Sequence, residues 1–159
     1  MQTTIHYTRT GKGSGTDWNY VTTATCVFEF DLPHKAVPRD FHNRWMAIDR
    51  TYDADGKETV TVTIPKDYAF DGPSVVPDFP GTVEASLVHD ALYQFVDAIA
   101  AGFGWSLLRV MYFADNRFYD VMSYLSVPFY ISWTYRAGVG AFGFIYNRGA
   151  KLFRWITGK

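Results

Sequence analysis

The chain has 159 residues, of which 48% are hydrophobic and 18% aromatic, with a net charge of -1 and a single cysteine. This length suits one domain with a buried core, and we expect residues 1–159 to form one. The near-zero charge gives no electrostatic basis for nucleic-acid binding. A single cysteine excludes an intramolecular disulfide, so packing must hold the fold together. No uncharged apolar run of about 18 residues occurs, so a simple transmembrane helix is not predicted.

The first 70 residues have the pattern of β-strands. Residues 22–32 and 45–52 are rich in β-branched and aromatic side chains. Residues 58–64 alternate almost strictly between polar and apolar side chains, so the apolar ones should face a core and the threonines should face solvent. The apolar members of this run are Val60, Val62 and Ile64.

Residues 71–159 have the pattern of helices. An apolar stripe at helical spacing predicts a first helix over residues 83–101, with Thr82 as its N-cap. A second helix is predicted from residue 106 to about 125, and a third helical region covers 130–156. The predicted fold class is therefore α+β: a small antiparallel sheet in the N-terminal half, followed by two or three packed helices.

A turn-forming loop leads into the first helix, which carries an adjacent histidine and aspartate. His89 is the side chain suited to moving protons near neutral pH. Asp90 and, on the loop, Asp71 are hard oxygen ligands, and Gly72 allows the backbone to come close to an ion. Because Ca²⁺ takes about six to eight oxygen ligands, we expect Asp71, the Gly72 carbonyl and Asp90 to meet around one.

The second predicted helix supplies a third carboxylate. Asp115 lies close to the apolar stripe of that helix, where a carboxylate needs a partner. His89 and Tyr93 are four residues apart and share a helix face. If the two helices pack antiparallel, Asp115 can accept hydrogen bonds from both, which would leave the other ring nitrogen of His89 as a base.

Each of these residues also has a structural interpretation. A His-Asp dipeptide is common, and an Asp-Gly pair before a proline is typical of a turn. Asp115 can belong to a hydrogen-bonded pair in the core. Two hypotheses follow from the residues alone: a catalytic site with a bound calcium ion, or a buried polar network that fixes the helix pair.

Three motifs in order resemble an uncharacterised family of phage and prophage proteins. That family has roughly D-G-x-S-x-P, then H-D-x-L-Y, then A-D-x-x-F. Here residues 71–77 read D-G-P-S-V-V-P, residues 89–93 read H-D-A-L-Y and residues 114–118 read A-D-N-R-F. The resemblance covers about residues 25–145, and the loop has one more residue before its second proline.

The same motifs are similar, more distantly, to bacterial-type secreted phospholipases A2. That resemblance implies a histidine that activates water for attack on a glycerophospholipid ester. The resemblance implies that His89 is the base and that Asp115 and Tyr93 orient it. It implies that the calcium ligands are Asp71, Gly72 and Asp90. The sequence departs from that family in lacking the cysteines that flank its His-Asp helix, and Pro73 removes one backbone N–H from the loop.

Two functions follow from these resemblances. The first is a phage-encoded, calcium-dependent lipid-ester hydrolase that acts on the host membrane. The alternative is a non-enzymatic virion component, in the tail or at the capsid vertex, that uses the same residues as a buried network. The predicted partners are membrane lipid or other virion proteins, with oligomer contacts through the aromatic C-terminal helices. The predicted location is the host cytoplasm on synthesis, or the virion.

Overall fold

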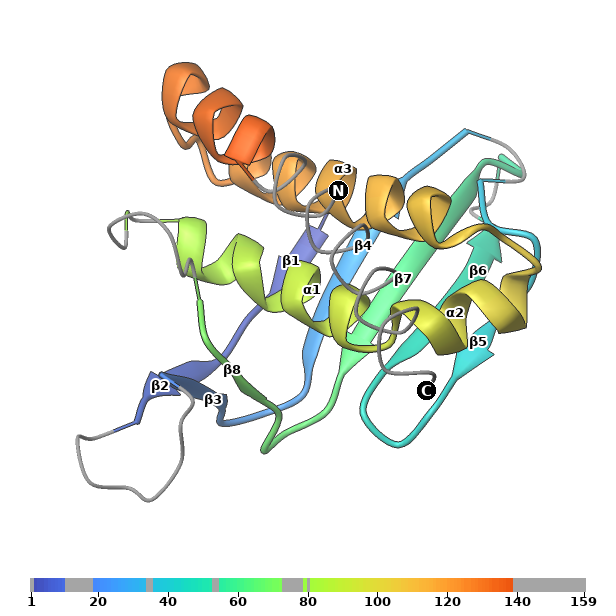
Figure 1. The fold of residues 1–159 in the computed structure, drawn as a ribbon, viewed down its shortest axis with the longest axis horizontal. Coiled ribbons are helices and arrows are strands. Elements are labelled where there is room, and N and C mark those ends of the chain that lie inside the picture. The colour runs from blue at the N-terminus through green and yellow to red at the C-terminus, as the bar shows by residue number, and fades with distance from the viewer. Residues whose placement is uncertain are drawn as a thin grey trace, which may run out of the picture.

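The computed structural model of the chain describes residues 2–10, 19–33, 36–52, 55–72, 79 and 81–138. It consists of two antiparallel sheets and a layer of helices that follows them in sequence (Figure 1). The strands are β1 (Gln2–Thr4), β2 (Tyr7–Arg9), β3 (Tyr20–Thr22), β4 (Cys26–Asp31), β5 (Phe41–His42), β6 (Ala47–Tyr52), β7 (Glu58–Ile64) and β8 (Ala69–Phe70). The helices are α1 (Thr82–Gln94), α2 (Val96–Phe103) and α3 (Leu107–Tyr124), and residues 129–138 are also helical. The predicted α+β fold class is confirmed.

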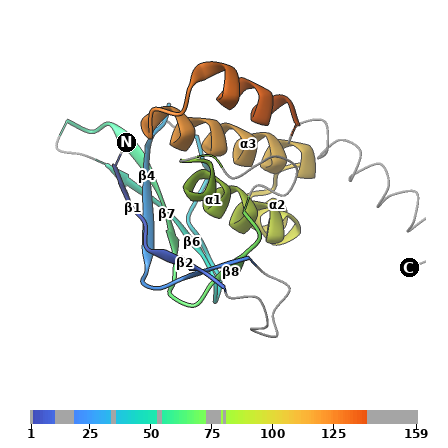
Figure 2. The same ribbon diagram turned by 90° about the vertical axis from the view of Figure 1, so that its left-hand side faces the viewer.

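The larger sheet has the order β1-β4-β7-β6-β5, and the smaller one has the order β2-β3-β8. In the larger sheet, Phe28, Val62 and Ile48 lie in register on neighbouring strands, and all three are fully buried. Figure 2 shows that α1, α2 and α3 lie on one side of this sheet. Apolar side chains from the inner face of the sheet therefore meet those of the helices in one core, as alternation along a half-buried sheet requires.

The prediction for residues 58–64 is confirmed on its apolar side and partly wrong on its polar side. The three apolar residues of this run are buried, as expected. Of the outward-facing threonines, Thr61 and Thr63 are half-buried, but Thr59 is buried. The hydroxyl of Thr59 is hydrogen-bonded to that of its cross-strand partner Thr51. This pairing satisfies a polar group that would otherwise be desolvated without a partner.

The predicted first helix is in fact two helices. Its backbone is interrupted at Phe95, which has φ -109 and ψ 20 and separates α1 from α2. The apolar stripe continues across this break, since Ala91, Leu92 and Ile99 are all buried. A break of one residue changes the direction of the chain without changing which side chains are apolar, so the sequence pattern does not reveal it.

The caps of the helices differ in how well they were predicted. Gly81, not Thr82, precedes α1 as its N-cap, with φ 88 and no side-chain cap. The Thr82 hydroxyl instead donates to the Phe79 carbonyl at 2.7 Å and accepts from the Phe79 N–H at 3.0 Å. The predicted start of the second helix is confirmed, because the Ser106 side chain accepts from the Arg109 N–H and caps α3.

The third predicted helical region is present from residue 129 to 138, and its remainder lies outside the described residues. This segment lies alongside α3 (Figure 2). Tyr135 packs on Phe118 with ring centroids 6.1 Å apart, and Arg136 Nη2 donates to Asn116 Oδ1 at 3.0 Å. The opposite side of the segment is apolar and open to solvent. Its exposed aromatic side chains are Phe129, Tyr130 and Trp133, which we call the 129–133 aromatic face.

Within the described part of the chain, no single helix is long and apolar enough to cross a membrane. The pair α2 and α3 reaches that length and hydropathy only when the two are taken together, and they are bent by 113° relative to each other.

Candidate active site

Asp115 of α3 joins two side chains of α1. The two helices run antiparallel and pack against each other (Figure 1). His89 Nε2 lies 3.2 Å from Asp115 Oδ1, and the Tyr93 hydroxyl donates to the same oxygen at 2.9 Å. The predicted contacts of Asp115 with His89 and Tyr93 are confirmed, while the catalytic roles of the three residues stay a prediction.

Aromatic rings fix the orientation of the His89 imidazole. It lies against the Tyr93 ring, with centroids 4.3 Å apart, and against the Phe118 ring at 5.2 Å. Since an ionised carboxylate only accepts hydrogen bonds, its contact with Asp115 places the ring proton on Nε2 in the neutral imidazole. The lone pair is then on Nδ1, the nitrogen that a base would use.

Asp90 lies on the Nδ1 side of the histidine. Its Oδ1 is 3.6 Å from His89 Nδ1. Burial and the negative charge of Asp71 raise the pKa of Asp90. The neighbouring His89 and the N–H of Gly72 act in the opposite direction. The fold therefore brings the Asp71–Gly72 loop to Asp90, as the sequence predicted. Gly72 acts on Asp90 through its N–H, and its predicted role as a carbonyl ligand stays untested.

The pKa of His89 is also shifted upwards. Burial alone would lower it, but the hydrogen bond to Asp115 and the contact with Asp90 outweigh burial and raise the pKa. A histidine with a raised pKa in the folded state stabilises the fold fully below its ordinary pKa of about 6.5. That contribution is lost as the pH rises through the pKa of the folded state.

The titration of His89 therefore gives a test of the site. Its ring is expected to titrate above the ordinary pKa, and Asp90→Asn should lower that value because it removes a neighbouring negative charge. The measurement is an NMR pH titration of the ring protons in both proteins. His42, whose pKa is raised by its contact with Asp49, is the internal control and should titrate alike in both. An unchanged His89 titration in the variant would contradict the arrangement.

Gly72 has a conformation and a position that only glycine suits. Its φ is +76, and a Cβ there would lie 2.7 Å from Cε2 of Tyr20, which is buried and stacked on Phe70. Gly56 has the same φ of +76 but nothing within 4 Å of its Cβ position. The two glycines therefore share backbone strain and differ in steric room.

This pair of glycines allows a matched comparison. Gly56→Ala is expected to cost about 1–2 kcal/mol of stability, which is the cost of a left-handed backbone with a side chain. Gly72→Ala should cost more, because Tyr20 must also move. Urea denaturation of the two variants measures the difference. Equal losses would show that the Tyr20 contact does not constrain the loop.

Two side chains next to Asp90 were not predicted. The Tyr68 hydroxyl donates to Gln94 Oε1 at 2.6 Å, and burial together with the charge of Asp90 raises the pKa of Tyr68. Gln94 lies one helical turn after Asp90, so the i, i+4 rule would have found it. Tyr68 follows the turn after β7, and no local pattern places it near α1.

The residues near Asp90 satisfy some requirements of a cation site. Oδ2 of Asp90 is buried and has no hydrogen-bond partner among the described residues, as expected of an oxygen that a ligand would complete. The described residues include no group of three His, Cys, Asp or Glu side chains arranged to hold a metal ion. Asp90 and Asp71 supply two carboxylates, so the other oxygen ligands of a calcium ion would be carbonyl groups and water.

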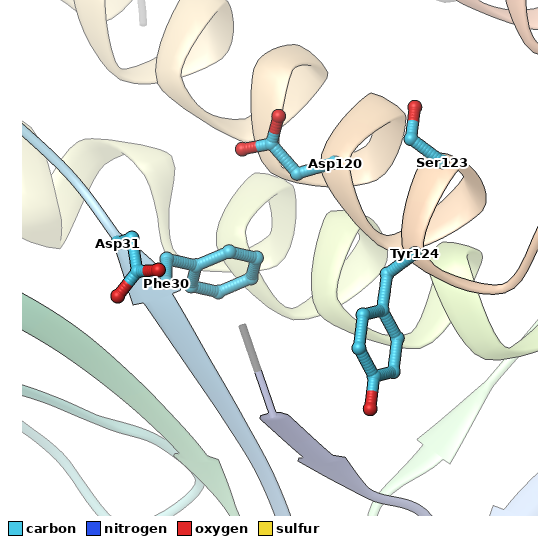
Figure 3. A pocket seen from close by; sticks show the side chains of 5 residues that line it. All are labelled: Phe30, Asp31, Asp120, Ser123 and Tyr124. Carbon is cyan, nitrogen blue, oxygen red and sulfur yellow. The ribbon is translucent and has the colours of Figure 1, made fainter.

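A cavity of about 400 Å³ lies away from this site (Figure 3). Its lining residues are Phe30, Asp31, Asp120, Ser123 and Tyr124. Its two carboxylates already have cationic partners: Asp120 with Arg117 at 2.7 Å, and Asp31 with Lys57 at 3.2 Å. The five residues that line this cavity include no histidine, so we place the candidate chemistry at His89.

Comparison of the chain with protein-family models, curated proteins and solved structures finds no match. The resemblances stated above therefore depend on the quoted motifs alone.

Proposed function

We propose that the protein is a calcium-dependent lipid-ester hydrolase of the phospholipase A2 type, encoded by a phage and acting on the host membrane. The observation that carries the proposal is the line of side chains Asp115, His89 and Asp90. Nε2 of the histidine contacts the first carboxylate and Nδ1 faces the second. This is the order needed for an oriented base beside an ion site.

In this proposal His89 is the general base. Nδ1 takes a proton from water as the water oxygen attacks the carbonyl carbon of the ester. The imidazolium formed is stabilised by Asp115, which accepts from Nε2 at 3.2 Å. The Tyr93 hydroxyl donates to the same carboxylate oxygen and helps to hold it in place. The proton on Nδ1 then passes to the leaving alkoxide, which restores the base.

Asp90, with Asp71 and backbone oxygens of the same loop, would hold the calcium ion. When bound, Ca²⁺ supplies a Lewis acid that polarises the ester carbonyl. The orphaned Oδ2 of Asp90 supports this assignment, because a buried carboxylate oxygen without a partner is costly unless a ligand completes it. The pKa of Asp90 is raised chiefly by burial, and a cation bound at this carboxylate would act against that rise.

Calcium binding is the direct test of this half of the site. Calorimetric titration of wild type with Ca²⁺ is expected to show binding that Asp90→Asn abolishes. Fatty-acid release from phospholipid vesicles, followed on the same samples, should require both Ca²⁺ and Asp90. Asp97→Asn, on the exposed side of α2, is the matched control and should behave as wild type. If wild type shows neither Ca²⁺ binding nor fatty-acid release, the motif has only a structural role.

The second candidate function is a non-enzymatic virion component. The observation that favours it is the 129–133 aromatic face, which leaves large apolar side chains in solvent and suits an assembly contact. In that case His89, Tyr93 and Asp115 serve only to fix the helix pair. The protein would then be found in purified virions, whereas the hydrolase would be synthesised and act in the infected host.

A further inference from the structure

We propose that a cavity beside the candidate active site binds the ammonium group of a zwitterionic phospholipid headgroup. The cavity has a volume of about 210 Å³ and is lined by Trp45, Asp67, Tyr68, Ala69 and Gln94. This inference rests on the proposed function and names its substrate class. None of these lining residues belongs to the predicted site.

The position of the cavity relates it to the site. Gln94 follows Asp90 by one turn of α1, which is about 5.4 Å along the helix axis. Tyr68 fixes this side of the cavity to α1, because its hydroxyl donates to Gln94 Oε1 at 2.6 Å and both residues line the cavity. In a glycerophospholipid the headgroup is attached close to the ester bonds. A lipid whose ester reaches His89 therefore has its headgroup within reach of this cavity.

The chemistry of the cavity wall suits a cation. Of its five lining residues, Asp67 alone carries a charge, and that charge is negative. Trp45 and Tyr68 provide aromatic rings, and tryptophan is the best of the aromatic side chains for binding ammonium groups. The guanidinium of Arg44 already lies 4.7 Å from the centroid of the Trp45 ring, so a bound ammonium group would share this ring with a cation of the chain itself.

The size of the cavity limits what it can hold. Sites for drug-sized ligands usually measure about 300–1,000 Å³, so about 210 Å³ suits a fragment such as a headgroup and leaves acyl chains outside. A trimethylammonium or primary ammonium group fits this description. A headgroup without an ammonium group offers hydroxyl groups to Asp67 but no positive charge, so phosphatidylglycerol should be a poorer ligand than phosphatidylcholine.

The first test measures binding without hydrolysis. Phosphocholine and glycerol phosphate are titrated separately into the full chain, and the Trp45 indole and Gln94 amide signals are followed by NMR. Phosphocholine should shift both signals, and Asp67→Asn should weaken its binding by about tenfold or more, because the charge is lost. Asparagine tolerates the φ of 66 found at Asp67, so the variant keeps its backbone conformation. Equal binding of both compounds, or unchanged binding in Asp67→Asn, would overturn the proposal.

The second test uses the lipid and separates the subsite from the hydrolase. Vesicles of phosphatidylcholine should be hydrolysed faster than vesicles of phosphatidylglycerol, and Asp67→Asn should remove that preference without slowing hydrolysis of phosphatidylglycerol. Hydrolysis that shows no headgroup preference would overturn the subsite and leave the proposed function standing. Phosphocholine binding without hydrolysis of either vesicle would overturn the hydrolase, and the cavity would then be a site for the free ammonium compound.

Discussion

His89→Gln is expected to reduce calcium-dependent fatty-acid release by about 10²–10⁴-fold, the usual contribution of a general base. Glutamine can still donate a hydrogen bond to Asp115, so the helix pair should survive, but an amide cannot take a proton from water. The measurement is the rate of fatty-acid release from phospholipid vesicles, together with the melting temperature of the variant. The expected result is a large loss of rate with a small loss of stability.

His89→Ala separates the two functions proposed for this network. It removes both the base and the hydrogen bond to Asp115. If the residues are only structural, His89→Ala should destabilise the protein and His89→Gln should restore most of the loss, with no activity to follow in either. Hydrolysis at the wild-type rate by purified His89→Gln would reject the general base. An unchanged melting temperature in His89→Ala would reject the structural network.

Asp115→Ala is expected to cost about 2–4 kcal/mol of unfolding free energy. The change leaves the Nε2–H of His89 and the hydroxyl of Tyr93 without their shared acceptor, and because both donors are only partly buried, each costs about 1–2 kcal/mol, the lower part of the range for an unsatisfied donor. Urea denaturation measures the loss. An unchanged m-value, the slope of the unfolding free energy against urea concentration, would show that only the folded state was affected. Asp115→Asn, which keeps one acceptor oxygen, should lose less.

The cost of Asp115→Ala should also depend on pH. Asp115 raises the pKa of His89 in the folded state, so its stabilising effect is fully present below the ordinary histidine pKa of about 6.5. It declines as the pH rises through the pKa of the folded state. The difference in stability between wild type and variant should therefore be larger at pH 6 than at pH 9. A difference that grows with pH would mean that His89 is not stabilised in its charged form.

Local patterns in the sequence were enough to predict most of the elements. Strict alternation over residues 58–64 gave the central strand β7 with its bounds, because period 2 has no helical interpretation. The predicted start of the second helix at residue 106 was also right, and the structure adds that Ser106 is its N-cap. The break at Phe95 was missed, since no glycine or proline marks it. The small sheet was missed as a separate unit, because its strands are two or three residues long.

The candidate site was predictable where it depends on helix geometry. His89 and Tyr93 share a face by their spacing, and Asp115 was placed by assuming antiparallel helices with a short connection. Asp71 and Gly72 were expected near Asp90 because the loop leads into α1, and the shifted pKa of Asp90 agrees. Tyr68 could not be found in this way. Tyr68 follows the turn after β7, and its contact with Gln94 of α1 is decided by the tertiary fold.

The two halves of the site are supported by very different parts of the fold. His89, Tyr93 and Asp115 belong to the packed pair α1 and α3, whereas Asp71 and Gly72 directly follow β8, a two-residue strand at the edge of the smaller sheet. A short edge strand opens locally at a lower free energy than a packed helix pair. An ion that binds there must also hold this edge closed, so its net binding free energy is smaller by the free energy of closing. Calcium affinity would thus depend on the stacking of Tyr20 against Phe70, two residues that are not ion ligands. Substitutions at these two positions would change the calcium affinity while the histidine and its carboxylates stay the same.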